Sequence, residues 1–416
     1  MTPSAAPMPS SPNVMSDNAS WGDLSSGAVI HCAVILGTRP EAIKLAPVIC
    51  ALRDDDHFKV TVILTGQHRE MVDQVMGLFN LHADRDLAIM QPKQTLTQIT
   101  CGALTGLEDL LVELAPDVVL VQGDTTTAFA AALAAFYQKI PVGHVEAGLR
   151  THDLWNPYPE EANRRLISQV AQFHFAPTPA AVANLEKSGI TAGVYHTGNT
   201  VIDALLQVRQ LQLAGQFAAQ PSDPQSQQIS PSPMVSGLNW QNHRVILATV
   251  HRRENWGAPL TAIAQAWLEI LTKFPDVAVV LPMHKNPVVR EPLQAILGDH
   301  PRVFLCEPFS YSELVAAMAE CYLVMTDSGG LQEEAPALGK PVLVLRLTTE
   351  RPEAITAGTA QLVGTDTEAI VAAAQTLLTD SEAYSAMANV ANPFGDGRAS
   401  QRIVQILRGQ TPEPLP

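Results

Sequence analysis

The sequence contains little cysteine, few charged residues and no long apolar run. Five cysteines stand among 416 residues, and none forms a C-x-x-C pair. This excludes a disulfide framework and a structural zinc motif, and it predicts free thiols in a reducing cytosol. No stretch approaches about 18 uninterrupted apolar residues, so no membrane span is expected. We therefore predict a cytoplasmic protein that does not insert into a membrane.

Positive charge is also scarce. The chain has 26 Lys and Arg against 41 Asp and Glu, and its formal net charge is −15. This balance argues against nucleic acid or an anionic membrane as the main partner, although a local cationic pocket is compatible with it. With 46% hydrophobic residues, the chain has enough apolar side chains for a large core and is not mainly disordered.

Strands and helices alternate twice along the chain. The first half has apolar segments typical of buried parallel strands, and the second half repeats the pattern. The expected strands are 33–36, 59–64, 117–121, 142–145, 244–250, 277–281, 323–326 and 341–345. Helices are expected at 69–79, 124–137 and 260–274. This alternation predicts an α/β fold with two doubly wound, Rossmann-like domains that face a cleft.

Composition divides the chain further. Residues 1–28 are rich in Ser, Pro, Ala and Met and lack the features of a signal peptide, so we predict a disordered tail. We expect an N-terminal domain over 29–205 and a second domain over 244–385. Between them, 206–243 is predicted to be a linker with a Gln/Ser/Pro-rich insertion. Residues 386–416 form a C-terminal segment.

Three turns at strand ends carry groups that suit an anion. In Gly37-Thr38-Arg39-Pro40-Glu41, a helix N-terminus, Arg39 and the following Lys44 could bind a phosphate, although an ordinary β–α turn is the alternative. In Asp327-Ser328-Gly329-Gly330, the glycines permit close backbone approach and Ser328 could cap a helix or bind a phosphate. The cluster His251-Arg252-Arg253-Glu254-Asn255 is either a second anion contact or a solvated loop, and Arg346 and Arg351 add two guanidinium groups.

Acidic residues follow other strands. Gln332, Glu333 and Glu334 are expected in the first turn of a helix, where they favour the helix dipole or hold a ribose. Asp124 and Glu146 follow buried strands, and Glu160 opens a helix after a Pro-rich turn. Three such carboxylates in one cleft could supply an acid and a base, although Glu160 also suits a plain first-turn position. No set of residues has convincing metal spacing, and P-loop, G-x-G-x-x-G and G-x-S-x-G motifs are absent.

These segments together resemble the non-hydrolysing UDP-N-acetylglucosamine 2-epimerases. The matching text is GTRPEAIKLAP, TGQHREM, QGDTTTAFA, GHVEAGLRT, PEEANR, TGNTVIDAL, HRREN, DSGGLQEEAPALGKPVLVLR and TTERPEA, between about Val34 and Ser400. The resemblance implies the two-domain GT-B fold, a homodimer, and a C-terminal helix that packs back on the N-terminal domain. It also implies interconversion of UDP-GlcNAc and UDP-ManNAc for polysaccharide synthesis, without a metal or redox cofactor.

The resemblance further implies roles for single residues. Arg39, His251, Arg351 and the Ser328-Gly329-Gly330 turn match positions that stabilise a diphosphate leaving group. One preorganised contact of this kind is worth about 3 kcal/mol of barrier. Asp124, Glu146 and Glu160 match the acid–base positions, and which group does which stays open. Glu334 matches a residue that holds the ribose.

Some positions depart from the family pattern or concern regulation. Leu347 stands in place of the usual Asp, and Asn156 stands where Ser is common. Many bacterial members bind a second UDP-GlcNAc as an activator, at positions that match Gln67, Glu160 and Arg252. Glu70 and Lys93 stand where some such members have Gln and Arg, and a carboxylate there would repel a diphosphate.

Three other functions fit parts of the pattern. A hydrolysing 2-epimerase would release UDP and ManNAc. A GT-B glycosyltransferase would use a separate acceptor, and no acceptor-binding patch is evident in the first half. A nucleotide-sugar-binding protein without catalysis is expected to have lost one of the three carboxylates, all of which are present.

Overall fold

The structure is a computed structural model that describes residues 29–66, 69–91, 93–215 and 238–415. The predicted tail at 1–28, most of the predicted insertion and Gln67 lie outside the described residues. For Arg69 and Glu70 only the backbone is described.

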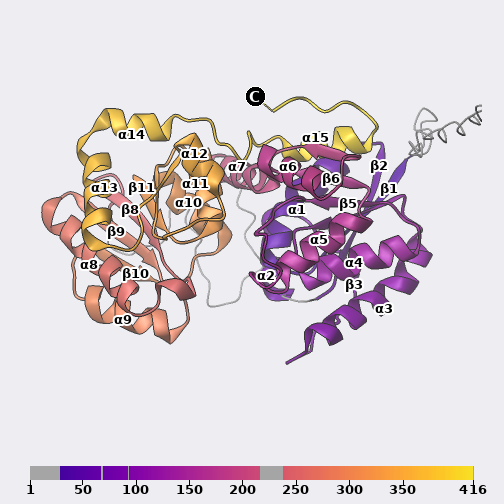
Figure 1. The fold of residues 1–416 in the computed structure, drawn as a ribbon, viewed down its shortest axis with the longest axis horizontal. Helices are drawn as coiled ribbons and strands as arrows, with labels where there is room; N and C mark the ends of the chain where they lie inside the picture. Colours follow the sequence, from indigo (N-terminus) through magenta and orange to yellow (C-terminus); the bar gives the residue numbers. More distant parts are fainter. Residues whose placement is uncertain (1–28, 67–68, 92, 216–237, 416) are drawn as a thin grey trace, which may run out of the picture.

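Two parallel β-sheets form the centres of two lobes (Figure 1). The first sheet has the strand order β3-β2-β1-β4-β5-β6-β7 and the second has the order β10-β9-β8-β11-β12-β13. The strands of the first sheet are β1 (Ile30–Leu36), β2 (Phe58–Leu64), β3 (Arg85–Asp86), β4 (Val118–Gln122), β5 (Val142–Val145), β6 (Phe173–Ala176) and β7 (Val194–His196). Those of the second are β8 (Arg244–Thr249), β9 (Val277–Pro282), β10 (Val303–Cys306), β11 (Leu323–Thr326), β12 (Val342–Val344) and β13 (Ala360–Leu362).

Helices cover both faces of each sheet, which explains why the strands are apolar throughout. In the first half of the chain they are α1 (Arg39–Arg53), α2 (Arg69–Leu78), α3 (Leu96–Leu114), α4 (Thr126–Tyr137), α5 (Glu160–Val170), α6 (Pro179–Lys187) and α7 (Thr200–Leu213). The second half contains α8 (Ala258–Lys273), α9 (Pro287–Leu297), α10 (Tyr311–Glu320), α11 (Gly329–Ala337), α12 (Pro352–Ala357), α13 (Thr367–Thr379), α14 (Ser381–Ala388) and α15 (Ala399–Leu407).

Helix α7 joins the two lobes. It packs against α1 of the first lobe and against α10 and α11 of the second. One cluster of buried side chains therefore runs from β1 and α1 through Ile202 and Leu205 to Val315 and Leu331. The burial of this continuous apolar surface favours a fixed relative position of the lobes.

The chain returns to its first lobe at its C-terminal end. After α14 on the second lobe, it crosses to α15, which packs against α1 and α7 (Figure 1). The apolar side chains of α15, among them Ile403 and Leu407, are buried in that contact.

The predicted fold class is confirmed. The eight expected strands are all present, with ends that differ from prediction by at most a few residues. Helix α7 continues to Leu213, into the range predicted as linker, and Val208 and Gln212 are buried there. The domain boundaries otherwise stay a prediction. Among the described residues, no helix combines the length and apolarity that crossing a membrane requires.

Candidate active site

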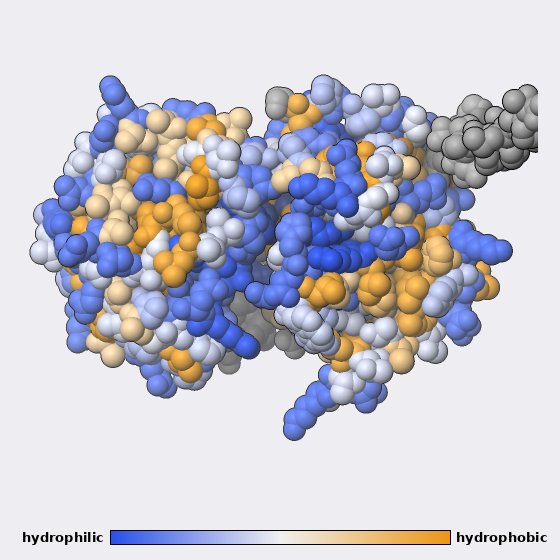
Figure 2. Space-filling model, viewed as in Figure 1, coloured by the Kyte–Doolittle hydropathy of each residue, from blue (hydrophilic) through white to orange (hydrophobic). Residues whose placement is uncertain are grey.

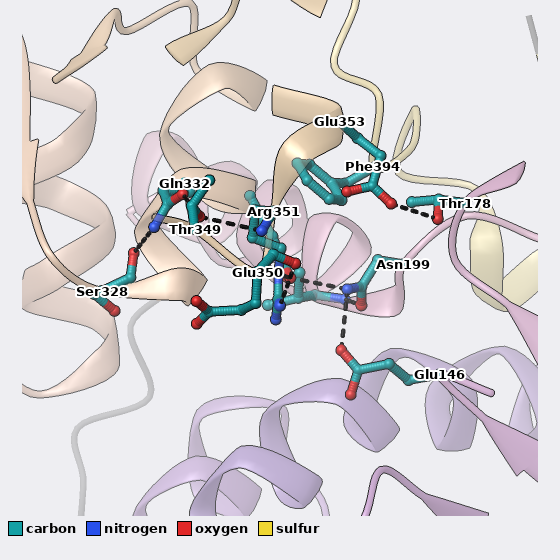
Figure 3. Close-up of polar contacts among 12 residues, drawn as sticks. Glu146, Thr178, Asn199, Ser328, Gln332, Thr349, Glu350, Arg351, Glu353 and Phe394 are labelled. Carbon is teal, nitrogen blue, oxygen red and sulfur yellow. Dashed lines mark hydrogen bonds and ion pairs between the residues drawn. The ribbon is translucent and has the colours of Figure 1, made fainter. Parts of the chain in front are cut away.

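Polar residues from both lobes meet where the lobes approach each other. Figure 2 shows hydrophilic residues on both sides of the gap between the lobes, and Figure 3 shows part of the contact network there. Glu146 follows β5, Asn199 caps α7, and Arg351 caps α12. Because the carboxyl ends of parallel strands carry these loops, residues far apart in the sequence come together.

Glu146 is the centre of the network on the first lobe. It is 8% exposed, and its carboxylate contacts the Lys44 ammonium and accepts a hydrogen bond of 2.5 Å from Gln122 Nε2. Burial alone would raise the pKa of Glu146, but the charge and hydrogen bond of Lys44 and the charges of Arg351 and Arg164 together outweigh it, so the pKa lies below its ordinary value. The backbone of Glu146 has a φ of 65°, an uncommon conformation for this residue type that is often found at functional sites. Glu146 is thus held as a buried carboxylate.

Glu333 and Arg351 form the matching pair on the second lobe. Arg351 Nε donates to Glu333, whose side chain is buried. Burial raises the pKa of Glu333, and the charges of Arg351 and Lys44 oppose this only in part. Arg351, predicted as a phosphate contact, is therefore neutralised by a carboxylate of its own lobe.

Asn199 joins these two carboxylates, and the sequence analysis did not single it out. Its Nδ2 donates to Glu146 Oε1 at 3.2 Å and to Glu333 Oε2 at 3.0 Å (Figure 3). Its Oδ1 accepts a hydrogen bond from the N–H of Val201 and caps α7. The only signal in the sequence was its place before a helix, which indicates a cap and nothing more.

The turn at Arg39 is arranged differently from the prediction. Glu41 is 1% exposed, and it accepts hydrogen bonds from the N–H groups of Gly37 and Thr38 at 2.9 and 2.6 Å. These two N–H groups are therefore occupied by Glu41, and a phosphate contact of Arg39 and the helix N-terminus stays a prediction. Arg39 itself lies close enough to Glu334 and Tyr311 for its charge to lower their pKa values.

Asp124 and Glu160 both lie at helix α5 of the first lobe. Asp124 pairs with Arg164 of α5, and the charge of Arg164 also lowers the pKa of Glu146. Oε2 of Glu160 is buried and has no hydrogen-bond partner within the described part of the chain. The neighbouring Glu161 is instead engaged by Thr151, Arg164 and Arg165. The two predicted carboxylates thus share the surroundings of α5.

His251 is fixed by Asp327. The backbone N–H of His251 donates to Asp327, and Nδ1 lies 3.2 Å from Asp327 Oδ1. Its ring stacks on that of His284, with 5.9 Å between the ring centroids. Burial lowers the pKa of His251 although Asp327 opposes the effect. Asp327 is fully buried, so the loop after β8 is anchored to the end of β11.

The glycine turn opens α11 as expected, but its acidic residues are placed differently. Ser328 is the N-cap residue and makes no side-chain capping bond, and Gly329 begins the helix. No acidic residue lies in the first turn. Glu333 and Glu334 lie in the second turn and are buried, so the prediction that they compensate the helix dipole at its first turn is wrong.

Glu334 is bonded to α10. Tyr311 donates from its hydroxyl to Glu334 Oε1 at 2.9 Å. Burial raises the pKa of Glu334 to about 7, although the hydrogen bond from Tyr311 lowers it. The predicted ribose contact is therefore a carboxyl group that titrates near neutral pH.

The remaining predicted cations lie in a separate network around Glu350. Arg252 contacts Glu350 at 2.8 Å, and the buried Arg346 contacts both Glu350 and Glu254. A Cβ atom on Gly329 would lie 2.9 Å from Glu350 Oε1, which ties this network to the glycine turn. Leu347 is 79% exposed.

The positions predicted for a second nucleotide sugar are only partly visible. Lys93 is exposed and has a φ of 63°. Gln67 lies outside the described residues, as does the side chain of Glu70. Among the residues with described side chains, no group of three or more His, Cys, Asp or Glu is arranged to hold a metal ion.

Comparisons with known proteins agree on one family. A family model described as UDP-N-acetylglucosamine 2-epimerase matches residues 50–408. The UDP-N-acetylglucosamine 2-epimerase of Salmonella typhimurium is 51% identical over 375 residues, which are 90% of this chain and 97% of that protein.

Solved structures agree with this result. The crystal structure of UDP-GlcNAc 2-epimerase from Neisseria meningitidis bound to UDP-GlcNAc is 48% identical, with a TM-score of 0.79 over 92% of this chain and all (100%) of that one. The Methanocaldococcus jannaschii UDP-GlcNAc 2-epimerase in complex with UDP-GlcNAc and UDP is 33% identical, with a TM-score of 0.69 over 91% of this chain and 99% of that one.

Proposed function

The chain belongs to the UDP-N-acetylglucosamine 2-epimerase family, and we propose that it interconverts UDP-GlcNAc and UDP-ManNAc without net hydrolysis. The observation that carries this proposal is the placement of the acid–base carboxylates of one lobe opposite the cations of the other. Asn199 donates a hydrogen bond to Glu146 directly. It also donates to Glu333, which in turn pairs with Arg351. Such a site could hold the sugar against one lobe and the diphosphate against the other.

The chemistry of carbon 2 explains why both sets of residues are needed. This carbon carries an amide nitrogen and no adjacent carbonyl, so its proton is not acidic and direct deprotonation would be very slow. In the proposed route, a base removes the proton from C2 while the bond from C1 to the UDP oxygen breaks. The products are 2-acetamidoglucal and UDP. The return step adds a proton to the other face of C2 and re-forms the bond from C1 to UDP.

The first lobe supplies the acid and the base in this proposal. Glu146 is held ionised by Lys44, and Asp124 is paired with Arg164. Glu160 completes the set, and its buried Oε2 has no hydrogen-bond partner within the described residues. Carboxylates with different surroundings can hold different protonation states at one pH, which an acid–base pair requires.

In this proposal UDP is bound mainly by the second lobe, with Arg39 and Lys44 of the first lobe as further contacts. Arg351, Arg39, His251 and the Ser328-Gly329-Gly330 turn contact the diphosphate, and Glu334 holds the ribose. Lys44 would exchange part of its contact with Glu146 for a phosphate oxygen. Charge that develops on the leaving diphosphate is then met by groups already in place, which is the main source of rate acceleration in such a reaction. The product would supply polysaccharide synthesis, in a homodimer located in the cytoplasm.

Proton and phosphorus NMR of the purified chain with UDP-GlcNAc in D2O tests the proposal. We expect UDP-ManNAc beside UDP-GlcNAc, deuterium at C2 and little free UDP. Accumulation of UDP and free ManNAc without a plateau would instead identify a hydrolysing enzyme. No reaction without an added sugar acceptor, followed by transfer when one is supplied, would identify a glycosyltransferase.

Single substitutions then test the carboxylates. Asp124→Asn, Glu146→Gln and Glu160→Gln should each lower kcat by a factor of about 100 or more, the usual scale for a general acid or base. Glu113→Gln is the control, because Glu113 is an exposed residue of α3. Deuterium exchange at C2 that persists at the wild-type rate in all three variants would contradict their assigned part in proton transfer.

A second UDP-GlcNAc molecule as activator is a separate part of the proposal. It would lie beside Arg252 and Lys93, with Gln67, Glu70 and Glu160 as the other candidate contacts. The reverse reaction should then require added UDP-GlcNAc. Hyperbolic kinetics in UDP-GlcNAc, together with a reverse reaction that needs none, would exclude this activation.

A further inference from the structure

We propose that Asn199 is a positioning residue that holds the catalytic carboxylate of the first lobe in register with the diphosphate-binding arginine of the second. The inference rests on the proposed function. It assigns to Asn199 a part in catalysis beyond its role as the cap of α7.

The first argument is the pattern of contacts. The amide nitrogen of Asn199 donates to Glu146 at 3.2 Å and to Glu333 at 3.0 Å, and both carboxylates are buried. Glu146 in turn contacts Lys44, and Glu333 contacts Arg351. A chain of polar contacts therefore runs from α1 across the lobes to the N-terminus of α12. A neutral amide with two N–H groups is the side chain that can join two carboxylates without adding charge.

The second argument is the rigidity of the support. Asn199 is 2% exposed, and its backbone N–H donates to the carbonyl of Phe394 at 2.7 Å. Its Oδ1 caps α7, the helix that packs against both lobes. On the other side, Asn392 donates to the carbonyl of Glu333 at 2.8 Å. The segment that returns to the first lobe is thus bonded to Asn199 and to Glu333.

The third argument is the reaction. Proton removal at C2 and departure of the diphosphate from C1 occur on adjacent atoms, so the base and the phosphate contacts must keep a fixed separation. A displacement of about 1 Å far from the reacting atoms is enough to cost a large factor in rate. The bridge through Asn199 sets this separation because it bonds the carboxylate of one lobe to the partner of Arg351 in the other.

Two substitutions separate the bridge from the cap. Asn, Asp and Ser are about equally good at the N-cap position, so Asn199→Ser and Asn199→Asp both keep the capping acceptor. Ser cannot reach the carboxylates as a donor, and Asp places a third carboxylate beside Glu146 and Glu333. A role limited to capping predicts wild-type activity for both variants. A bridging role predicts a lower kcat in both variants, and a larger loss in Asn199→Asp although Asp has the same shape as Asn.

The test compares kcat at saturating UDP-GlcNAc with the affinity for UDP measured by calorimetry, in the full chain. We expect kcat to fall about tenfold in Asn199→Ser and about a hundredfold in Asn199→Asp, in proportion to the loss of a hydrogen bond to a charged group. The Kd for UDP should stay within about threefold of the wild-type value in Asn199→Ser, because that variant neither removes a phosphate contact nor adds a charge. Asn239→Asp is the matched control, since Asn239 lies in an exposed turn where its Oδ1 accepts from Gln241.

Each outcome decides the question. Wild-type activity in both Asn199 variants, or a greater loss in Ser than in Asp, would overturn the inference. Equal losses of UDP affinity and kcat in Asn199→Ser would also overturn it, because they would place Asn199 in nucleotide binding. If Asn199→Asp does not fold, the kcat and Kd of Asn199→Ser decide alone. A wild-type chain that does not interconvert the two sugars refutes the proposed function before the variants are compared.

Discussion

At the scale of single residues, two cations of the candidate site each have a carboxylate of the chain as partner. Lys44 pairs with Glu146 and Arg351 with Glu333. A buried charge is tolerated only when it is paired, so these contacts keep the site stable before a ligand enters. An incoming diphosphate must then compete with carboxylates for the same cations. Binding at this site is an exchange of partners, and the carboxylates that lose a cation become easier to protonate.

Tyr311→Phe should weaken UDP binding and move its pH dependence. The hydroxyl of Tyr311 lowers the pKa of Glu334, which burial raises to about 7. Without that hydrogen bond the pKa of Glu334 rises further. As the pH falls, Glu334 is then protonated at a higher pH and loses the ionised form that accepts hydrogen bonds from the ribose hydroxyls. At pH 7 we expect a three- to tenfold higher Kd, from about 1 kcal/mol for one hydrogen bond.

Calorimetric titration with UDP between about pH 6 and pH 9, which covers the range in which a carboxyl group with a pKa near 7 titrates, measures both effects. Tyr322→Phe is the control, because the Tyr322 hydroxyl donates to the carbonyl of Leu377 at 3.1 Å, away from the site. A midpoint that stays in place or moves to lower pH in Tyr311→Phe would show that Glu334 does not govern binding.

At the scale of secondary structure, adjacent strands of the first sheet bury two histidines side by side. His144 of β5 and His174 of β6 are register partners, and both are buried. Burial lowers the pKa of each to about 4. His144 Nε2 lies 2.7 Å from the carbonyl of Gly123, which fixes the loop that leads to Asp124. Two neutral imidazoles thus support the strand end that carries Glu146.

These histidines should make the fold sensitive to acid. In the unfolded chain a histidine has a pKa of about 6.5, so below that pH the unfolded state binds protons that the folded state excludes. The contribution of these two histidines to the free energy of unfolding should therefore fall as the pH drops below about 6.5. It should level off near pH 4. Urea unfolding across this range should show a shallower slope for His174→Gln than for the wild type. The exposed His82→Gln is the control, and an equal change of slope in both variants would contradict the prediction.

Eight of the thirteen described strands were predicted from the sequence, whereas the contacts between the elements were not. Apolar runs such as 323–326 have one interpretation in an alternating α/β chain, and the strand is found there. The bridge of Glu146, Asn199 and Glu333 joins residues 53 and 134 positions apart. No local pattern encodes such a contact, because it depends on how the two sheets are placed. The second-turn position of Glu333 and Glu334 follows from the start of α11 at Gly329, and their burial there is the part that the local sequence did not indicate.

At the scale of the whole molecule, the end of the chain fastens the second half to the first. Asp203 of α7 is 1% exposed and accepts hydrogen bonds from the N–H groups of Ala399 and Ser400 at 3.2 and 2.7 Å. Arg402 of α15 contacts Asp396 and the carbonyl of Thr197. The carboxylate of α7 therefore caps α15, and the crossing segment is bonded at both ends. The lobes are joined by two segments of the chain and by one shared hydrophobic core.

Asp203→Asn should weaken the attachment of α15 to α7. Asn has the shape of Asp, but only one of its two side-chain atoms accepts hydrogen bonds, and the amide N–H groups would face backbone donors at a buried site. We expect the free energy of unfolding to fall by about 1–3 kcal/mol, the cost of leaving buried groups unsatisfied. Asp366→Asn, at the exposed N-cap of α13, should cost only a few tenths of a kcal/mol, since Asn and Asp cap equally well. Urea unfolding measures both variants. Hydrogen exchange of Asp203→Asn should show a loss of protection concentrated in α15. Equal changes in the free energy of unfolding for the two substitutions would mean that the contact of Asp203 with α15 contributes no more than an ordinary helix cap.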